Sequence, residues 1–240
     1  MTSGTKPRST QPSSLGLRRI ALLEGLSVER LEALARACAW RNYRAGQPII
    51  SRVAPDRDVH LIVTGRVSVT TYSASGKQVT FRDLGAGELF GEIAAIDDMP
   101  RSADVVALES TLTASLSPAA FRKLLREEPV VAERVLRRLS GVVRRISERV
   151  IDLSTLGVHD RIHAELLRLA REAGVKHNAA RIEHAPKHAD LASQVSTYRE
   201  EVTRELSALA RAGILRRDGH ALMIRDVRRL EALVEQGRAG

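Results

Sequence analysis

Hydrophobic positions near the start of the chain follow helical spacing. Apolar residues recur every three or four positions over Leu17–Leu23 and again over Val28–Ala37, which predicts two helices. Ser27 precedes the second segment and suits the N-cap position, where a hydroxyl accepts from a free amide of the first turn. Residues 1 to about 14 are rich in Ser, Thr and Pro and include Lys6. We predict a disordered tail there, because these residues bury too little apolar surface to offset the entropy of ordering.

Between about residue 40 and residue 117 the pattern changes to short apolar runs separated by Gly, Pro, Asp and Ser. Ser75-Gly76 is a typical turn between two of these runs. Many short strands in one block indicate an antiparallel roll or barrel. The predicted strands include Val59–Val63, Val67–Val69, Val79–Leu84, Val105–Leu108 and Leu112–Leu116.

Helical periodicity returns after this block. Pro118 to about Leu125 is predicted as a short helix, Pro129 as an interruption, and Val130–Leu153 as one long amphipathic helix. A helix of about 24 residues spans roughly 36 Å, which is more than a small domain needs to cover its own core. We therefore expect two copies to pair as a symmetric coiled-coil dimer, with packing of this helix on its own roll as the alternative. The apolar stripe consists of Val135, Leu139, Val142, Ile146, Val150 and Leu153.

Gly157 is predicted to mark a hinge before a second domain. A helix over about 159–173, a short strand near Arg181–Glu183, two further helices and a hairpin follow it. The expected organisation is a tail over 1–14, a roll over 15–128, a dimerisation helix with its hinge over 129–156, and a second domain over 157–240.

Charge and cysteine content narrow the function classes. The net charge of +9 favours contact with a polyanion, either nucleic acid or a membrane surface, although a merely solvated basic surface has the same charge. Cys38 is the single cysteine, which excludes an internal disulfide and a cysteine-cluster metal site, and we expect it in the core. The chain has neither an apolar run of about 18 residues nor the apolar core of a signal peptide, so a cytoplasmic protein without membrane contact is expected.

The segment Gly87–Ala103 carries the most specific chemistry. Gly91 permits backbone conformations barred to other residues, and the apolar turn Ile93–Ile96 can begin a short helix whose free amides face an anion. The planar guanidinium of Arg101 suits two phosphate oxygens. A carboxylate at Glu92 would repel a phosphate unless it accepts from a sugar hydroxyl. This combination indicates a ribose phosphate, and the alternative is a simple Arg101–Glu92 ion pair that closes a loop.

From Phe90-Gly91-Glu92 to Pro100-Arg101-Ser102-Ala103, this segment resembles the phosphate-binding cassette of cyclic-nucleotide-binding domains. The resemblance implies that Glu92 binds the ribose 2′-hydroxyl and that Arg101 pairs with the cyclic phosphate. Ser102 and the backbone of Gly91 and Glu92 would assist, and Ile93 completes the expected ligand-binding set.

Residues 187–206 have the spacing of a helix-turn-helix, whose second helix enters the major groove of DNA. Ser196-Thr197-Tyr198 is the predicted turn, with Thr197 as a possible cap. Arg can bind guanine through two acceptors and Glu can accept from cytosine N4, each pair contributing ~1–3 kcal/mol of base discrimination. The apolar faces are Leu191, Ala192 and Val195 on the first helix and Val202, Leu206 and Leu209 on the second, and the exposed face carries Arg199, Glu200 and Arg204.

The Arg-Glu-x-Val-x-Arg pattern that begins at Arg199 resembles the recognition helix of the CRP/FNR superfamily, close to its cyclic AMP receptor proteins. Ala210–Leu215 and the Asp218-Gly219 hairpin resemble the wing, and the likeness covers about residues 17–230. It implies an α+β fold with a jelly-roll-like N-terminal β-roll, a long dimerisation helix and a C-terminal winged helix-turn-helix. It also implies a palindromic operator similar to TGTGA-N6-TCACA, and RNA polymerase is an expected partner.

One departure from this family lies in the turn, where Ser196 replaces the usual glycine. Lys187 and His188 stand just before the first helix and are expected to contact phosphates rather than bases, and Tyr198 is assigned to the same DNA interface.

In the family, a Thr-Ser pair on the long helix helps to complete the base pocket, and Ile146-Ser147 stands at that position here. Ser147 could reach the purine, but Ile146 lacks the second hydroxyl, which weakens the inference of adenine. We favour cyclic AMP, with cyclic GMP as the alternative because Ser102 could touch a guanine amino group. Ligand bound to the cassette and the helix together would shift the dimer toward one placement of its recognition helices.

Rival interpretations remain at this point. A regulator of the same superfamily could sense another effector or act constitutively. An iron–sulfur sensor would need several cysteines, and a haem sensor would need an axial pair, for which His60 in an apolar strand is a poor candidate. An enzyme is not expected, since we find no Walker loop, metal triad or convincing nucleophile–base pair. His184 and His188 lack a third partner and are interpreted as surface residues, so no metal is expected. The helix-turn-helix disfavours a scaffold that binds cyclic nucleotide without DNA.

Overall fold

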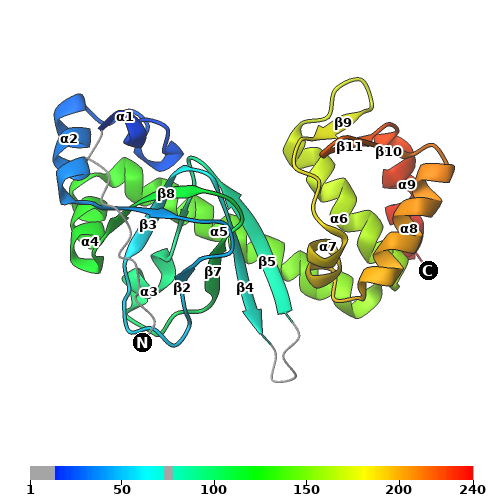
Figure 1. The fold of residues 1–240 in the computed structure, drawn as a ribbon, viewed down its shortest axis with the longest axis horizontal. Helices are drawn as coiled ribbons and strands as arrows, with labels where there is room; N and C mark the ends of the chain where they lie inside the picture. Colours follow the sequence, from blue (N-terminus) through cyan, green and yellow to red (C-terminus); the bar gives the residue numbers. More distant parts are fainter. Residues whose placement is uncertain (1–13, 73–77, 240) are drawn as a thin grey trace. The chain divides into compact units, whose positions relative to one another are not determined.

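The computed structural model describes residues 14–72 and 78–239. The chain forms two compact units, residues 1–141 and 142–240, and the long helix α5 (Pro129–Thr155) contributes residues to both (Figure 1). The predicted tail, apart from Ser14, and the predicted Ser75-Gly76 turn lie outside the described residues.

The first helices of the chain illustrate one confirmed and one wrong prediction. Helix α2 (Val28–Ala37) begins at the predicted cap, where the Ser27 hydroxyl accepts from the Arg30 amide at 3.2 Å. The segment Leu17–Leu23 is not one helix, because α1 (Ser14–Leu17) ends early and a 3-10 turn, η1 (Ala21–Leu23), follows it. The Ala21 amide donates to the Gly87 carbonyl instead of to the preceding helical turn.

Two four-stranded antiparallel sheets form the predicted roll, in the orders β1-β8-β3-β6 and β2-β7-β4-β5. Ile62 of the first sheet shares one buried apolar cluster with Val67 and Leu84 of the second, so the sheets pack face to face. The strands are β1 (Ala39–Tyr43), β2 (Pro48–Ile50), β3 (Val59–Thr64), β4 (Arg66–Tyr72), β5 (Gln78–Gly85), β6 (Leu89–Phe90), β7 (Asp104–Ala107) and β8 (Thr111–Leu116).

Two consecutive helices follow the roll. Helix α4 (Pro118–Glu127) is capped by Ser117, whose hydroxyl accepts from the Ala120 amide at 3.3 Å. Pro129, predicted as an interruption, is instead the first residue of α5. Proline is favourable at that position because the missing N–H has no helical partner there, and the break lies at Glu128, the C-cap of α4.

The long helix uses its apolar residues in two different ways. Val131 and Val135 are buried in the same core cluster as Trp40 and Phe121, so the first turns of α5 pack on their own roll, as the alternative prediction had it. Beyond them an apolar row stays exposed, by 40–65%, and from Val143 onward it has the alternating three- and four-residue spacing of a coiled-coil seam. This exposed row contains Leu136, Val143, Ile146, Val150 and Leu153. The predicted stripe is therefore wrong at Val135, which is buried in the roll, and at Leu139, which packs against the same core.

The second unit contains the predicted winged helix-turn-helix elements. Its three-stranded sheet has the order β10-β11-β9, and a cluster that includes Leu166, Leu191 and Val202 forms its core. None of the helices in the described part of the chain is long and apolar enough to span a membrane. The elements are α6 (Val158–Ala173), β9 (Ala180–Ile182), α7 (His188–Gln194), α8 (Arg199–Arg211), β10 (Leu215–Asp218), β11 (Ala221–Ile224) and α9 (Val227–Ala239).

Candidate functional site

Gly91 holds the backbone turn at the centre of the candidate cassette. It lies between β6 and the short helix α3 (Glu92–Asp97) and has a φ of 85°, a left-handed conformation that favours glycine. A Cβ at this position would lie 2.7 Å from the Asp58 carbonyl oxygen and 2.8 Å from Nη1 of Arg101. The predicted need for glycine is therefore confirmed, and the close approach adds a second reason for it.

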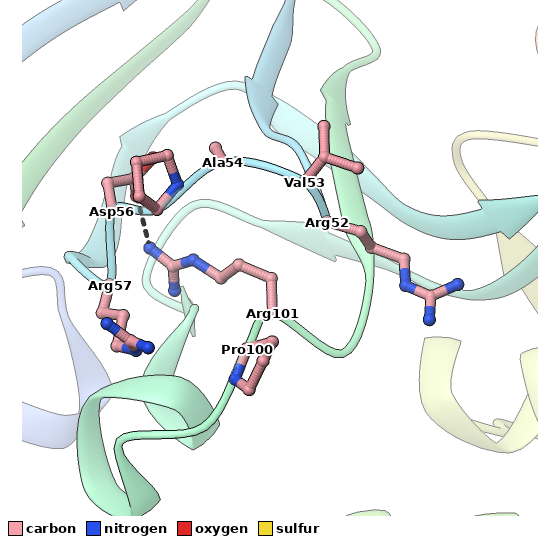
Figure 2. A pocket seen from close by; sticks show the side chains of 8 residues that line it. Arg52, Val53, Ala54, Asp56, Arg57, Pro100 and Arg101 are labelled. Atoms are coloured by element: carbon pink, nitrogen blue, oxygen red, sulfur yellow. Dashed lines mark hydrogen bonds and ion pairs between the residues drawn. The ribbon is translucent and has the colours of Figure 1, made fainter.

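Arg101 is held deep in the roll, with only 2% of its side chain exposed. Its Nη1 donates to the Gly91 carbonyl at 3.0 Å, and its Nη2 donates to the Asp58 carbonyl at 2.9 Å and to Oδ1 of Asp56 at 2.6 Å. Figure 2 shows the guanidinium directed at Asp56. Within the described residues, its buried Nε has no hydrogen-bond acceptor. The alternative prediction of an Arg101–Glu92 ion pair is wrong, because Asp56 takes the place of Glu92.

A cavity of about 220 Å³ adjoins this guanidinium. Asp56 is half exposed at its edge, and Ser102 follows Arg101 as an exposed residue. Charged and apolar side chains share the lining of the cavity (Figure 2). The cavity is lined by Arg52, Val53, Ala54, Pro55, Asp56, Arg57, Pro100 and Arg101.

Glu92 is a buried carboxylate between two arginines. Only 4% of its side chain is exposed, and its Oε1 lies 3.9 Å from Nη2 of Arg82 and 3.8 Å from Nε of Arg138. Both distances exceed a hydrogen bond, so the two guanidinium groups balance the buried charge without fixing the carboxylate by direct bonds. Ile93, the next residue, is exposed.

His60 is a packed histidine, as the sequence analysis favoured. Its ring stacks on Phe90 with centroids 4.9 Å apart, and its Nδ1 lies 3.4 Å from the Thr113 hydroxyl. Burial, together with the nearby positive charge of Arg101, lowers the pKa of His60 to about 3. The ring is therefore neutral over the physiological range of pH.

The helix-turn-helix of the second unit has the predicted apolar frame. Leu191, Ala192 and Val195 are buried, and Val202 and Leu209 are buried on α8. The predicted capping role of Thr197 is wrong: Tyr198 is the N-cap of α8, and Thr197 is buried with its amide donating to the Ala192 carbonyl at 2.9 Å.

The exposed side of α8 carries the charged residues that the sequence assigned to DNA. Arg199 and Glu200 are exposed in its first turn, Arg204 follows with its Nη1 3.3 Å from Oε1 of Glu201, and Tyr198 is 71% exposed before it. Lys187 is the exposed N-cap of α7.

His188 is not a plain surface residue, which corrects the sequence interpretation. Its Nδ1 lies 2.8 Å from the Thr203 hydroxyl and so joins α7 to α8. Partial burial is the main cause that lowers the pKa of His188, and the positive charges of Arg217 and Arg199 lower it further. His184 is exposed, as predicted.

Ile146 and Ser147 belong to the unit formed by residues 142–240, whereas the cassette belongs to the other unit. Both residues are exposed, and the Ser147 hydroxyl donates to the Val143 carbonyl at 3.0 Å within α5. Their part in a base pocket stays a prediction.

Comparison with known proteins identifies the family. A cyclic nucleotide-binding domain model matches residues 40–128, and a Crp-like helix-turn-helix domain model matches residues 160–233. The Cyclic AMP receptor protein of Thermus thermophilus is 30% identical over 216 residues, which cover 88% of this chain and 95% of that protein. The chain belongs to the CRP/FNR family of transcription regulators.

Other relatives of this CRP/FNR regulator match it over most of its length. A CRP-like cAMP-activated global transcriptional regulator of Mycobacterium tuberculosis is 25% identical over 215 residues, covering 89% of this chain and 96% of that protein. A CooA mutant from Carboxydothermus hydrogenoformans has the same fold, with a TM-score of 0.76 at 20% identity and coverage of 95% of this chain and 98% of that chain. The regulator therefore combines a cyclic nucleotide-binding domain with a DNA-binding helix-turn-helix domain.

Sequence reasoning missed several residues of this CRP/FNR regulator that surround the cassette. Asp56 and Asp58 bind the Arg101 guanidinium, and Arg82 and Arg138 face Glu92. Their positions in the sequence lie far from the cassette and carry no motif. Arg138 looked like one of many arginines on the polar faces of the long helix, and only tertiary contacts distinguish it from its neighbour Arg137.

Proposed function

We propose that this CRP/FNR regulator binds a cyclic nucleotide in the cassette, with cyclic AMP favoured and cyclic GMP as the alternative. Arg101 would pair with the cyclic phosphate, assisted by Ser102, Ile93 and the backbone at Gly91. Glu92 would accept from the ribose 2′-hydroxyl. The observation that carries this proposal is the buried Arg101 guanidinium, whose Nε has no acceptor within the described residues. Such a donor suits an anionic ligand.

Ile146 and Ser147 of α5 would complete the pocket that holds the base of the nucleotide. The Thermus relative is a cyclic AMP receptor protein and the Mycobacterium relative is a cAMP-activated regulator, which supports a cyclic nucleotide as the effector.

For DNA, we propose a homodimer that binds a palindromic operator resembling TGTGA-N6-TCACA. The exposed apolar row of α5 supports a pairing of two long helices, since a partner helix would remove this row from water. Base contacts are assigned to Arg199, Glu200 and Arg204, and phosphate or flanking contacts to Lys187, His188 and Tyr198. We also place the regulator in the cytoplasm, with RNA polymerase as its partner in transcription control.

Calorimetry with cyclic AMP and cyclic GMP tests the ligand. We expect Arg101→Ala to abolish binding of the preferred nucleotide while the protein keeps its oligomeric state. Arg52→Ala is the matched control, because Arg52 lines the same cavity but its guanidinium donates to the Thr71 hydroxyl, outside the cassette. Unchanged nucleotide affinity in Arg101→Ala would contradict the proposal.

A second candidate is a regulator that binds DNA without a nucleotide or responds to another effector. The observation in its favour is that both Nη atoms of Arg101 already have acceptors within the protein, including the Asp56 carboxylate. This candidate predicts that neither nucleotide binds to the wild-type protein and that operator affinity is unchanged when either is added.

A further inference from the structure

Arg138 links the long helix α5 to strand β6 and to Glu92, the first residue of helix α3. Its Nη2 donates to the Leu89 carbonyl at 2.6 Å, its Nη1 lies 3.3 Å from Oε1 of Glu88, and its Nε lies 3.8 Å from Oε1 of Glu92. Only 19% of the side chain is exposed. One guanidinium group thus contacts three residues of the five-residue segment that runs from Glu88, just before β6, to Glu92, the first residue of α3.

The Nη atoms of Arg138 make hydrogen bonds to Glu88 and Leu89, whereas its Nε lies too far from Glu92 for one. Glu88 is itself fixed, because its other oxygen accepts from the Gly85 amide at 2.9 Å. Nε of Arg138 is buried and, among the described residues, has no hydrogen-bond partner, although Oε1 of Glu92 lies only 3.8 Å away. A small movement of that carboxylate would complete a charge-assisted hydrogen bond, which is stronger than a neutral one.

We propose that Arg138 is the positioning residue that transmits occupancy of the Glu92 site to helix α5. This inference rests on the proposed function, in which a ligand hydroxyl donates to Glu92. That bond holds the carboxylate in one position, where Oε1 can accept from Nε of Arg138. The ligand-bound state therefore has one contact between the cassette and α5 that the free state lacks, and such a differential contact is what a ligand needs to shift an equilibrium.

The other arginines near Arg138 cannot have this role. Arg82 lies at 3.9 Å from the same Glu92 oxygen, but it belongs to β5, so its contact stays within the roll. Arg137 belongs to α5 but is 78% exposed and pairs with Glu133 one turn earlier in the same helix. Arg137 is therefore a matched control for Arg138, because it has the same residue type and lies on the same helix but pairs with Glu133 rather than with the cassette.

The experiment measures how strongly the nucleotide changes operator affinity. Full-length protein is titrated onto labelled operator DNA by fluorescence anisotropy, without nucleotide and with saturating cyclic AMP or cyclic GMP, and the ratio of the two dissociation constants is the coupling factor. We expect Arg138→Gln to lower this factor at least about fivefold, within the range of allosteric coupling. Calorimetry should show that Arg138→Gln still binds the nucleotide in the absence of DNA, and Arg137→Gln should keep the wild-type factor.

Further variants separate coupling from folding. Arg138→Lys keeps the charge but lacks the planar fork, so we expect it to recover only part of the coupling factor. If Arg138→Gln loses the thermal transition of the folded protein, Glu88→Gln takes its place, because an amide oxygen still accepts from Gly85 while the charge pair with Arg138 is removed. We expect Glu88→Gln to lower the factor at least about twofold.

The outcomes distinguish this inference from the proposed function. If the wild-type protein shows no change of operator affinity with either nucleotide, the proposed function itself fails. If the wild-type protein responds and a folded Arg138→Gln, or Glu88→Gln in its place, keeps the coupling factor of Arg137→Gln, the role assigned to Arg138 is overturned.

Discussion

At the scale of single residues, the cassette depends on side chains and backbone groups that approach one another closely. Gly91 faces the Asp58 carbonyl, and the same carbonyl accepts from Arg101. A change at one of these positions therefore displaces the others. The buried His60 adds a titratable group beside them, and its protonation is opposed by burial and by the charge of Arg101.

Gly91→Ala tests the two reasons for glycine at this position, the left-handed backbone conformation and the close approach of neighbouring atoms. We expect a loss of stability well above the ~1–2 kcal/mol of left-handed strain alone, because the methyl group would also collide with Asp58 and Arg101. Gly46→Ala is the control, since Gly46 has a φ of 78° but nothing within 4 Å of its added Cβ. Urea denaturation followed by the fluorescence of Trp40, the single tryptophan in the chain, reports on this unit. Equal destabilisation of the two variants would contradict the steric part of this prediction.

His60 is expected to make the roll sensitive to acid. The pKa of His60 is about 3 in the folded protein, against the ordinary histidine value of 6.5, so between these values the unfolded chain binds a proton that the folded chain does not. The free energy of unfolding therefore falls as pH drops below about 6.5. The contribution of His60 between pH 7.5 and 5.5 is about 1.4 kcal/mol.

The measurement compares denaturation curves of the wild-type protein and His60→Gln at these two pH values. We expect the variant to lose that part of the pH dependence, whatever its absolute stability. The exposed His184 serves as the control, and His184→Gln should behave as the wild type does. An identical pH dependence in His60→Gln would show that His60 does not cause the sensitivity.

At the scale of elements, the turn between α7 and α8 shows how a local conformation positions a DNA-binding helix. Ser196 has a φ of 56°, in the left-handed region where the family usually has glycine. A small polar residue can adopt this conformation at moderate cost, so the departure from the family leaves the turn intact. The next residue, Thr197, is buried, and Tyr198 begins α8.

Ser196→Val is expected to destabilise the helix-turn-helix by about 1–2 kcal/mol relative to Ser196→Gly, since a β-branched side chain is strongly disfavoured at positive φ. Trp40 lies in the other unit and does not report on this one. Native-state hydrogen exchange of the α7 and α8 amides is therefore the suitable measurement. Equal protection in the two variants would mean that the left-handed conformation is not required.

At the scale of the whole molecule, the first and the later turns of helix α5 have different structural roles. Its first turns complete the core of the roll through Val131 and Val135. Its later apolar residues, such as Val143 and Val150, are exposed in this single chain. Burial of apolar surface stabilises by about 25 cal/mol per Å², so a row of this length favours pairing with a second copy.

Val143→Glu is expected to shift the protein from dimer to monomer, because a carboxylate in the seam would be buried without a partner. Arg144→Glu introduces the same side chain at the next position, outside the exposed row, and should leave the dimer intact. Sedimentation or light scattering over a range of protein concentrations gives the oligomeric state. A dimeric Val143→Glu variant would place the dimer interface elsewhere.

The sequence by itself determined the order and type of most elements. Ser27 and Ser117 cap their helices through residues three positions away, and Gly91 and Ser196 adopt conformations that local backbone preferences allow. The motifs Gly91-Glu92 and Arg101-Ser102 identified the cassette for the same reason: their residues are close in the chain. Short-range interactions of this kind can be predicted, because both partners lie in one segment.

Only the tertiary structure decided which charges meet. Arg101 pairs with Asp56, 45 positions earlier, and Glu92 faces Arg82 and Arg138 rather than Arg101. It also decided that Val135 enters the core while Val143 stays exposed on the same helix. The physical reason is that long-range pairing depends on how sheets and helices pack. Periodicity along the chain gives the apolar face of a helix, but it does not give the surface that each turn of that face will contact.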